Sequence, residues 1–270
     1  MRNTSFGAHL RWWRVRRGLS QLDLASAAGT SQRHVSFLES GRTQPSREML
    51  LCLAAALDMP LRQQNALLLA AGFAPIWRER DLAAPELATV SRALDHILTQ
   101  QEPFPAVVVD RHWNLLRANL GAQRLTTFLT GPASEQSPPA AINLAEWLLS
   151  PAGLRPLLVN WQDVAIHFLR GVQADAMADG TADTAGLLRR LLDYPGMPAL
   201  SRVPALEEPH PPVLTMHFRK GETSLRLFTT IATLGTPQDV TVQEMRIECF
   251  FPADAATSQV FNDWAAHSSH

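Results

Sequence analysis

Hydrophobic residues in the first part of the chain recur every three or four positions, in short runs separated by turn residues. Phe6, Leu10 and Trp13 share one face of the first run, which predicts a helix over residues 5–17 that Gly18 ends. Four more helices are expected, over residues 20–28, 30–40, 46–59 and 61–71. Five short helices with turn residues at every junction predict a compact all-α domain.

The second part of the chain mixes helical and strand patterns. Alternation of apolar and polar residues predicts a hairpin over residues 105–117 and antiparallel strands over residues 214–218, 225–231 and 245–249. Helices are expected over residues 119–130, 143–150 and 155–192, the last interrupted near Gly171 and Gly180. Two segments rich in Pro predict loops, over residues 131–140 and 195–212. This order of elements predicts an α+β domain with a small antiparallel sheet.

The expected fold class is therefore a mainly α protein of two domains. Its predicted parts are an all-α domain over residues 1–75, a linker helix within 76–102, an α+β domain over 103–257 and a C-terminal tail over 258–270. The linker helix falls between Pro85 and Gln101, where apolar residues have helical spacing. It either packs on the second domain or serves dimerisation or signalling between the domains.

Composition narrows the function classes. The 270 residues are 46% hydrophobic and 18% charged, which is enough apolar material for sizeable cores. No apolar run reaches the ~18 residues of a membrane span, and no apolar signal-peptide core is found, so we expect a cytoplasmic protein without membrane contact. Cys52 and Cys249 alone cannot form a disulfide scaffold or a four-cysteine zinc site. No familiar catalytic motif occurs, so we expect no enzyme, no catalytic residue, no cofactor and no metal.

Charge is divided unequally along the chain. Residues 1–80 contain eleven arginines and five acidic residues, a net charge of +6, whereas the remaining residues carry −7. Because the first domain is basic and the second is acidic, we expect that only the first domain binds a polyanion.

The segment 20–42, SQLDLASAAGTSQRHVSFLESGR, has the anatomy of a helix-turn-helix. Ala25 is small where two helices would cross closely, and Gly29 tolerates the positive φ that the turn needs. Val35 can fill the space between the helices. This spacing and the local positive charge predict DNA binding. A helix-turn-helix used only for protein contacts is the alternative.

Residues 5–71 resemble the DNA-binding domain of the Xre/phage-repressor family. The resemblance rests on the segment 20–42 and on Arg42-Thr43-Gln44-Pro45 at its end. The resemblance implies that the third helix lies in the major groove of double-stranded DNA. It assigns DNA contacts to Gln21, Ser31, Gln32, Arg33, Ser36, Phe37 and Arg42. Gln32 suits adenine and Arg33 suits guanine, whereas Gln21 and Arg42 are candidates for phosphate. Phe37 either packs on a thymine methyl group or is partly buried. A structural pair between Arg14 and Glu39 would fix the third helix.

The second domain resembles the methylenomycin-regulator-like (MmyB-like) ligand-binding domain. The resemblance rests on Pro105–Asp110, Trp113, Asn119, Asn143-Leu144, Trp161 and the segment 225–254. It implies a PAS-like fold, with helices over one face of the sheet, and a fatty-acid-like ligand. Candidate ligand contacts are Trp161, Phe168, Met216, Phe218, Leu227, Ile231 and Met245; an ordinary core is the alternative. Arg226 and Arg246 alternate as outward-facing residues would, although a carboxylate anchor is also considered.

These features predict a transcription regulator with a DNA-reading domain and a sensor domain that binds a small apolar ligand. We expect a homodimer on an inverted-repeat operator, because one small helix-turn-helix buries too little DNA for tight binding. The alternative is a regulator whose second domain binds no ligand and serves as a platform for dimerisation or for contact with RNA polymerase.

Overall fold

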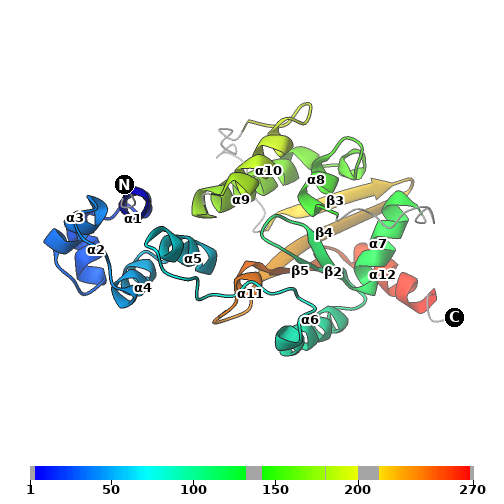
Figure 1. The fold of residues 1–270 in the computed structure, drawn as a ribbon. Helices are drawn as coiled ribbons and strands as arrows, with labels where there is room; N and C mark the ends of the chain where they lie inside the picture. Colours follow the sequence, from blue (N-terminus) through cyan, green and yellow to red (C-terminus); the bar gives the residue numbers. More distant parts are fainter. Residues whose placement is uncertain (1–3, 132–141, 180, 200–212, 268–270) are drawn as a thin grey trace. The chain divides into compact units, whose positions relative to one another are not determined.

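The computed structural model describes residues 4–131, 142–179, 181–199 and 213–267 (Figure 1). The chain forms two compact units, the first of residues 1–81 with 236–243 and the second of residues 82–235 with 244–270. The segment 236–243, which the sequence boundaries included in the C-terminal domain, thus belongs to the first unit. Of the two expected loops, residues 132–140 and 200–212 lie outside the described residues.

The expected five-helix arrangement of the first unit is confirmed. The helices are α1 Thr4–Arg16, α2 Gln21–Ala27, α3 Gln32–Glu39, α4 Arg47–Ala56 and α5 Leu61–Ala70. Serine hydroxyls begin three of them, because Ser20, Ser31 and Ser46 each accept a hydrogen bond from the backbone N–H three residues later. Asp23 completes a capping box with Ser20.

Close helix packing explains the small residues of this unit. Gly29 has a φ of +65° in the turn between α2 and α3, a conformation that residues with a Cβ rarely adopt. Ala25 and Val35 are buried on either side of that turn, as their spacing predicted. Gly7 of α1 lies so near the end of α3 that a Cβ there would stand 2.3 Å from the Glu39 carbonyl oxygen. A side chain at position 7 would therefore push the two helices apart.

The segment 236–243 packs on the chain that follows α5. It carries most of a short helix, α11 (Val240–Glu244). The Val240 N–H donates to the Arg78 carbonyl oxygen at 2.8 Å. Arg80 Nη1 forms an ion pair with the buried Asp239 Oδ2 at 2.6 Å. These contacts attach a segment that is distant in sequence to the first unit.

The second unit has a five-stranded sheet and surrounding helices, which confirms the expected α+β class. Its elements are η1 Pro85–Leu87, α6 Ala88–Gln100, β1 Ala106–Val109, β2 Leu115–Ala118, α7 Leu120–Thr130, α8 Leu144–Leu149, η2 Arg155–Leu157, α9 Trp161–Asp179, α10 Ala182–Leu192, β3 Thr215–Lys220, β4 Thr223–Ala232, β5 Arg246–Pro252 and α12 Ala255–His267. The strand order is β2-β1-β5-β4-β3, and every neighbouring pair is antiparallel. The turn expected at Lys220-Gly221-Glu222 joins β3 to β4, and Gly221 has a φ of +57°.

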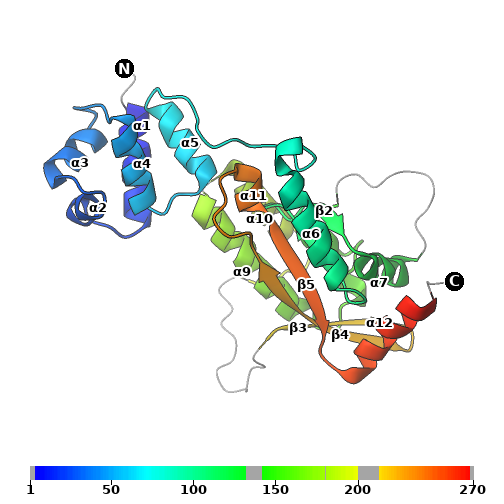
Figure 2. The ribbon, with the colours of Figure 1, turned by 90° about the horizontal axis from the view of Figure 1, so that it is seen from below.

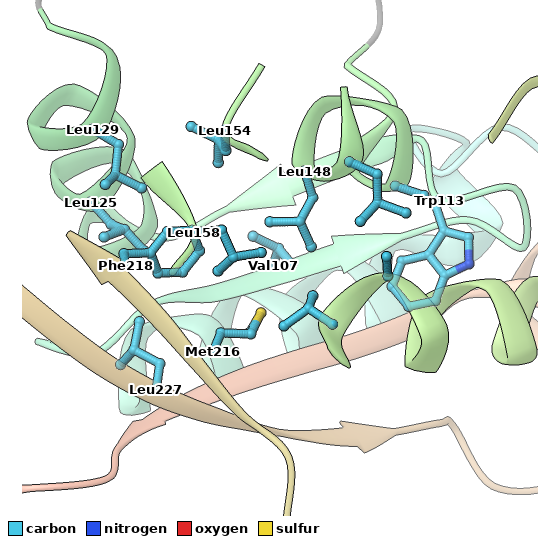
Figure 3. Close-up of a cluster of buried hydrophobic side chains, with 14 of the residues drawn as sticks. Val107, Trp113, Leu125, Leu129, Leu148, Leu154, Leu158, Met216, Phe218 and Leu227 are labelled. Carbon is cyan, nitrogen blue, oxygen red and sulfur yellow. The ribbon is translucent and has the colours of Figure 1, made fainter. Parts of the chain in front are cut away.

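Helices pack against both faces of the sheet. Cross-strand partners share a face, and the register places Met216, Ile231 and Glu248 on one side. Helix α7 and helix α8 supply leucines to this side, and Figure 3 shows Leu125 turned toward Phe218 of β3. Figure 2 shows α6 across the opposite face. We expected helices over one face of the sheet only, whereas the structure has helices over both faces.

Two predictions about helices are corrected. Helix α9 continues through Gly171 without the expected interruption, because a glycine costs a helix only about 1 kcal/mol and its neighbours Leu169 and Val172 are fully buried. Residues 258–267, expected as a tail, continue α12, whose Phe261 is completely buried against Phe104 and Trp264. Burial of a large aromatic ring explains why this end of the chain is ordered.

Within the described residues, no helix combines the length and apolarity needed to cross a membrane.

Candidate functional sites

Helix α3 carries most of the side chains that the sequence assigned to DNA. Gln32 and Arg33 are exposed in its first turn. Ser31 caps the helix, because its hydroxyl accepts a hydrogen bond from the His34 N–H at 3.1 Å. The exposed end of the helix therefore combines two side chains that can reach base edges with a helix N-terminus that favours phosphate.

The Phe37 ring contacts two arginines beside this end of α3. The Arg33 guanidinium lies 5.1 Å from the ring centroid and the Arg42 guanidinium lies 5.6 Å from it. Phe37 is half-buried, as is its neighbour Ser36, whereas both arginines are exposed. Cation–π contacts of this kind limit the orientations available to a long side chain. The ring thus holds two positive charges on one surface, in addition to any contact that it makes itself.

The predicted pair of Arg14 and Glu39 is present. Arg14 Nε donates to Glu39 Oε1 at 2.6 Å, and Nη2 donates to Oε2 at 3.0 Å, so the contact is bidentate. Gln21 Nε2 donates to the same Glu39 Oε2 at 2.8 Å. The Gln21 amide has a second N–H, so one donor remains for the phosphate contact that the sequence suggested. Glu39 thereby joins α1, α2 and α3.

The concave face of the sheet in the second unit borders an apolar cavity of about 380 Å³. Its lining comes from the sheet, from α7 and α8, and from α9; it includes Val107, Leu115, Ala118, Ala122, Leu125, Leu129, Leu144, Trp147, Leu148, Phe168, Met216, Phe218, Glu248 and Phe250. Pockets of about 300–1,000 Å³ with mostly apolar walls are typical of small-molecule sites. Glu248 is the one charged residue among those named.

A second and more polar cavity adjoins the first. Its volume is about 470 Å³, and it shares Phe168, Met216 and Glu248 with the apolar cavity. Arg246 lines it and donates from Nη2 to Asp175 Oδ1 at 2.6 Å. Phe168, Met216 and Glu248 therefore form a wall common to the apolar and the polar cavity.

Only some of the residues expected to contact a ligand line the two cavities. Phe168, Met216 and Phe218 line the apolar cavity, and Ile231 lines the polar one. Leu227 and Met245 are buried outside the linings of both. Trp161 also lies outside them, since its ring is covered by the Arg155 guanidinium at 3.6 Å. Its place at the first turn of α9, next to η2, explains this position.

The face of β5 that borders the cavities is the opposite of the one that we expected. Alternation placed Met245, Ile247 and Cys249 on one face, with Met245 as a candidate ligand contact, and suggested that Arg246 faces outward. The register instead pairs Glu248 with Ile231 and with Val107, on the cavity side. A charged residue in the otherwise apolar run IECFF was the available sequence signal, and the interpretation by hydrophobicity alone passed over it. Arg226, by contrast, is exposed as expected.

Burial controls the ionisation of Glu248. The residue is 3% exposed. Desolvation raises the pKa of its carboxyl to about 7, and the positive charge of Arg246 opposes part of this rise. The site therefore holds a carboxyl that exchanges its proton near neutral pH. Among the described residues, no group of three or more potential ligands could hold a metal ion.

Family comparisons agree with both halves of this arrangement. Residues 90–263 match the family model of the MmyB-like transcription regulator ligand binding domain, and residues 10–64 match a helix-turn-helix family model. No curated protein matches the chain.

Among solved structures, the restriction-modification controller protein C.AhdI from Aeromonas hydrophila is 38% identical. That match covers 23% of this chain and 92% of the controller protein, with a TM-score of 0.22. The clp gene regulator ClgR from C. glutamicum is 30% identical over 27% of this chain and 90% of ClgR, with a TM-score of 0.24.

The raised pKa of Glu248 predicts a specific pH dependence of stability. Between about pH 4.5 and about pH 7 the folded chain keeps a proton that the unfolded chain releases, so stability falls as pH rises through this window. Glu248→Gln removes this titration. From pH 5 to pH 8, its free energy of unfolding should therefore gain about 2–3 kcal/mol relative to the wild type.

Urea unfolding at several pH values measures this difference. Glu222→Gln, in the exposed turn between β3 and β4, is the matched control and should keep the wild-type pH dependence. Parallel pH profiles for the wild type and Glu248→Gln would show that the carboxyl has an ordinary pKa.

Proposed function

The chain belongs to the MmyB-like transcription regulators, and from this premise we propose that a small ligand in its second unit controls sequence-specific DNA binding by its first. The helix-turn-helix and the ligand-binding domain establish a DNA-binding regulator of this class. The ligand that we propose is fatty-acid-like, with a long apolar chain. The protein is proposed to act as a homodimer on an inverted-repeat operator.

The apolar cavity is the observation that carries this proposal. A protein interior is normally close-packed, and an unfilled apolar space loses both dispersion contacts and stability. A cavity of about 380 Å³ with mostly apolar walls between the sheet and its helices has the size of a small-molecule site. Its walls suit a hydrocarbon chain, and the adjoining polar cavity suits the end of that chain.

The DNA-binding half of the proposal rests on the exposed end of α3. Gln32 and Arg33 present amide and guanidinium groups, and the Phe37 contact keeps Arg33 beside Arg42. In a dimer, two such helices would enter successive major grooves about 34 Å apart. An inverted repeat with that spacing is the expected operator.

The segment 236–243 offers a route from ligand to DNA-binding unit. The chain reaches it directly from β4 and leaves it directly into β5, and both strands line the cavities. Within the first unit, Gln243 Oε1 accepts a hydrogen bond from the Leu61 N–H at the start of α5. A ligand that moved either strand would displace this connection. It changes DNA affinity only if it binds two conformations unequally.

Replacement of the base-reading arginine should weaken and broaden DNA recognition. Arg33→Ala removes the bidentate donor proposed for guanine, so operator affinity should fall by about 1–3 kcal/mol with relaxed preference at one base position. Operators selected from random DNA with the wild-type protein, followed by binding titrations, measure both effects. Arg92→Ala, an exposed arginine on α6, is the control. Equal loss on every DNA sequence would show that Arg33 touches phosphate only.

Filling the apolar cavity should abolish ligand retention. Ala122 lies in the cavity wall on α7, and Ala122→Phe would occupy part of the chamber. Native mass spectra of the full chain, after incubation with C10–C16 fatty acids, should show a wild-type dimer with a few hundred daltons of added mass that denaturation removes. The variant should lack that mass, whereas Ala185→Phe, at an exposed position of α10, should keep it. A wild-type dimer without added mass would favour the ligandless platform.

Weakening the attachment of the segment 236–243 should reduce the effect of ligand binding on operator binding. Asp239→Asn removes the charge that pairs with Arg80, so ligand and operator should each still bind, while the effect of ligand on operator affinity shrinks. Operator titrations with and without ligand measure this coupling. Asp58→Asn is the matched control, since Asp58 is 96% exposed in its side chain and pairs only loosely with Arg17 at 3.4 Å. Unchanged coupling in Asp239→Asn would exclude this route.

A further inference from the structure

Arg246 lines the polar cavity, and most of its hydrogen-bonding capacity is unused. A guanidinium has five N–H donors. Among the described residues, Asp175 alone accepts one of them, from Nη2 to Oδ1 at 2.6 Å. The Arg246 side chain is 23% exposed and borders the cavity of about 470 Å³. Its remaining donors are therefore available to an acceptor that enters this cavity.

The pairing of Arg14 shows how a saturated arginine is bound in the same chain. Arg14 donates from Nε and Nη2 to the two carboxylate oxygens of Glu39, and from Nη1 to the Leu19 carbonyl oxygen. Arg246, by contrast, forms one hydrogen bond with Asp175, whose Oδ2 is buried without a donor among the described residues. The contact of Arg246 with Asp175 thus leaves most of the planar fork that can bind a carboxylate through two parallel hydrogen bonds.

Helix α9 leaves space in the wall of the polar cavity. Gly171 lines this cavity one turn before Asp175, and a Cβ at position 171 would meet no other atom within 4 Å. His167, one turn earlier on α9, and Thr229 of β4 add polar side chains to the lining. The polar cavity therefore combines free volume with groups that can form hydrogen bonds.

The boundary with the apolar cavity consists of Phe168, Met216 and Glu248, which line both spaces. Met216 is unbranched, and a methionine side chain adapts readily to what lies beside it. Burial raises the pKa of the Glu248 carboxyl to about 7, so at pH 6 this group is mostly uncharged and opposes an anion little. The boundary is therefore compatible with an apolar chain on one side and an anionic end on the other.

We propose that Arg246 binds the carboxylate of the fatty-acid-like ligand in the polar cavity. This inference rests on the proposed function, because it names the residue that selects the polar end of a molecule whose chain lies in the apolar cavity. One guanidinium can serve two carboxylates, since its donors lie along more than one edge of the fork. Asp175 competes with the ligand for the charge of Arg246 and so lowers the affinity for the carboxylate.

Two ligands with the same chain length test the polar end separately from the chain. We would titrate the full-length protein with decanoate and with 1-decanol by isothermal calorimetry at pH 6. The wild type should bind decanoate at least about tenfold more tightly, because hydrogen bonds between charged partners contribute roughly that factor. Arg246→Gln should remove this preference and retain the affinity for decanol. Arg226→Gln, at an exposed position of β4 outside both cavities, should keep the wild-type preference.

Asp175→Asn gives a second test, in which affinity increases. The substitution removes the negative charge that competes for Arg246, so decanoate should bind several-fold more tightly than it binds the wild type. The affinity for decanol should stay the same, since a hydroxyl carries no charge. A gain of this kind does not arise from a variant that fails to fold. Decanoate binding that is unchanged or weaker in Asp175→Asn would overturn the assignment of Arg246.

The outcomes separate this inference from the proposed function. Equal affinity of the wild type for decanoate and decanol, or a preference that persists in Arg246→Gln, would overturn the carboxylate site and leave a cavity that binds the chain. Failure of both ligands to bind the wild type, as well as Ala122→Phe, would refute the ligand-binding role itself and the carboxylate site with it. A preference for decanoate that Arg246→Gln removes and Asp175→Asn increases would support the inference.

Discussion

The connection between β4 and β5 is the constraint on which the organisation of this protein depends. The two strands are antiparallel neighbours, and such a pair needs only a short turn. Residues 233–245 join them instead, and the middle of this connection packs in the first unit through Asp239 and Val240. Long connections inside a compact domain usually have a function. Here two neighbouring strands of the sheet that borders the cavities are joined by a segment that belongs to the first unit.

Within the first unit, the side chains that orient helix α3 differ from those that we propose to read bases. Glu39 is buried at the end of α3 and holds Arg14 of α1 and Gln21 of α2, so it fixes the helix without facing DNA. Removing one partner of such a pair leaves an uncompensated charge and is strongly destabilising. Arg33 and Arg42, in contrast, are exposed, and each guanidinium lies over the Phe37 ring. Their replacement can therefore change specificity with little effect on folding.

The sequence predicted those features that local chemistry determines. Serine caps, Gly29 in its turn and the Arg14–Glu39 pair follow from short-range patterns or from the family resemblance, and all are present. The cavity was only partly predictable, because core and cavity walls use the same apolar residues. The side of β5 that faces the cavity depends on its pairing with β1 and β4, and hydrophobicity alone favoured the opposite side. The role of Arg246 likewise depends on Asp175, which is distant in sequence.

The same physical features that make the second unit costly to fold make it suitable as a sensor. A desolvated carboxyl costs folding free energy, and an apolar chamber has fewer packing contacts than a filled core. Under the proposed function, a molecule in this chamber would add contacts to the sheet, so its binding energy would be coupled to the packing of the sheet. The strand that carries Glu248 follows the segment that contains Asp239 along the chain, and this is the path by which we propose that such a change is transmitted. Under the proposed function, the ligand would therefore not need to touch the first unit to alter the conformations that this unit adopts.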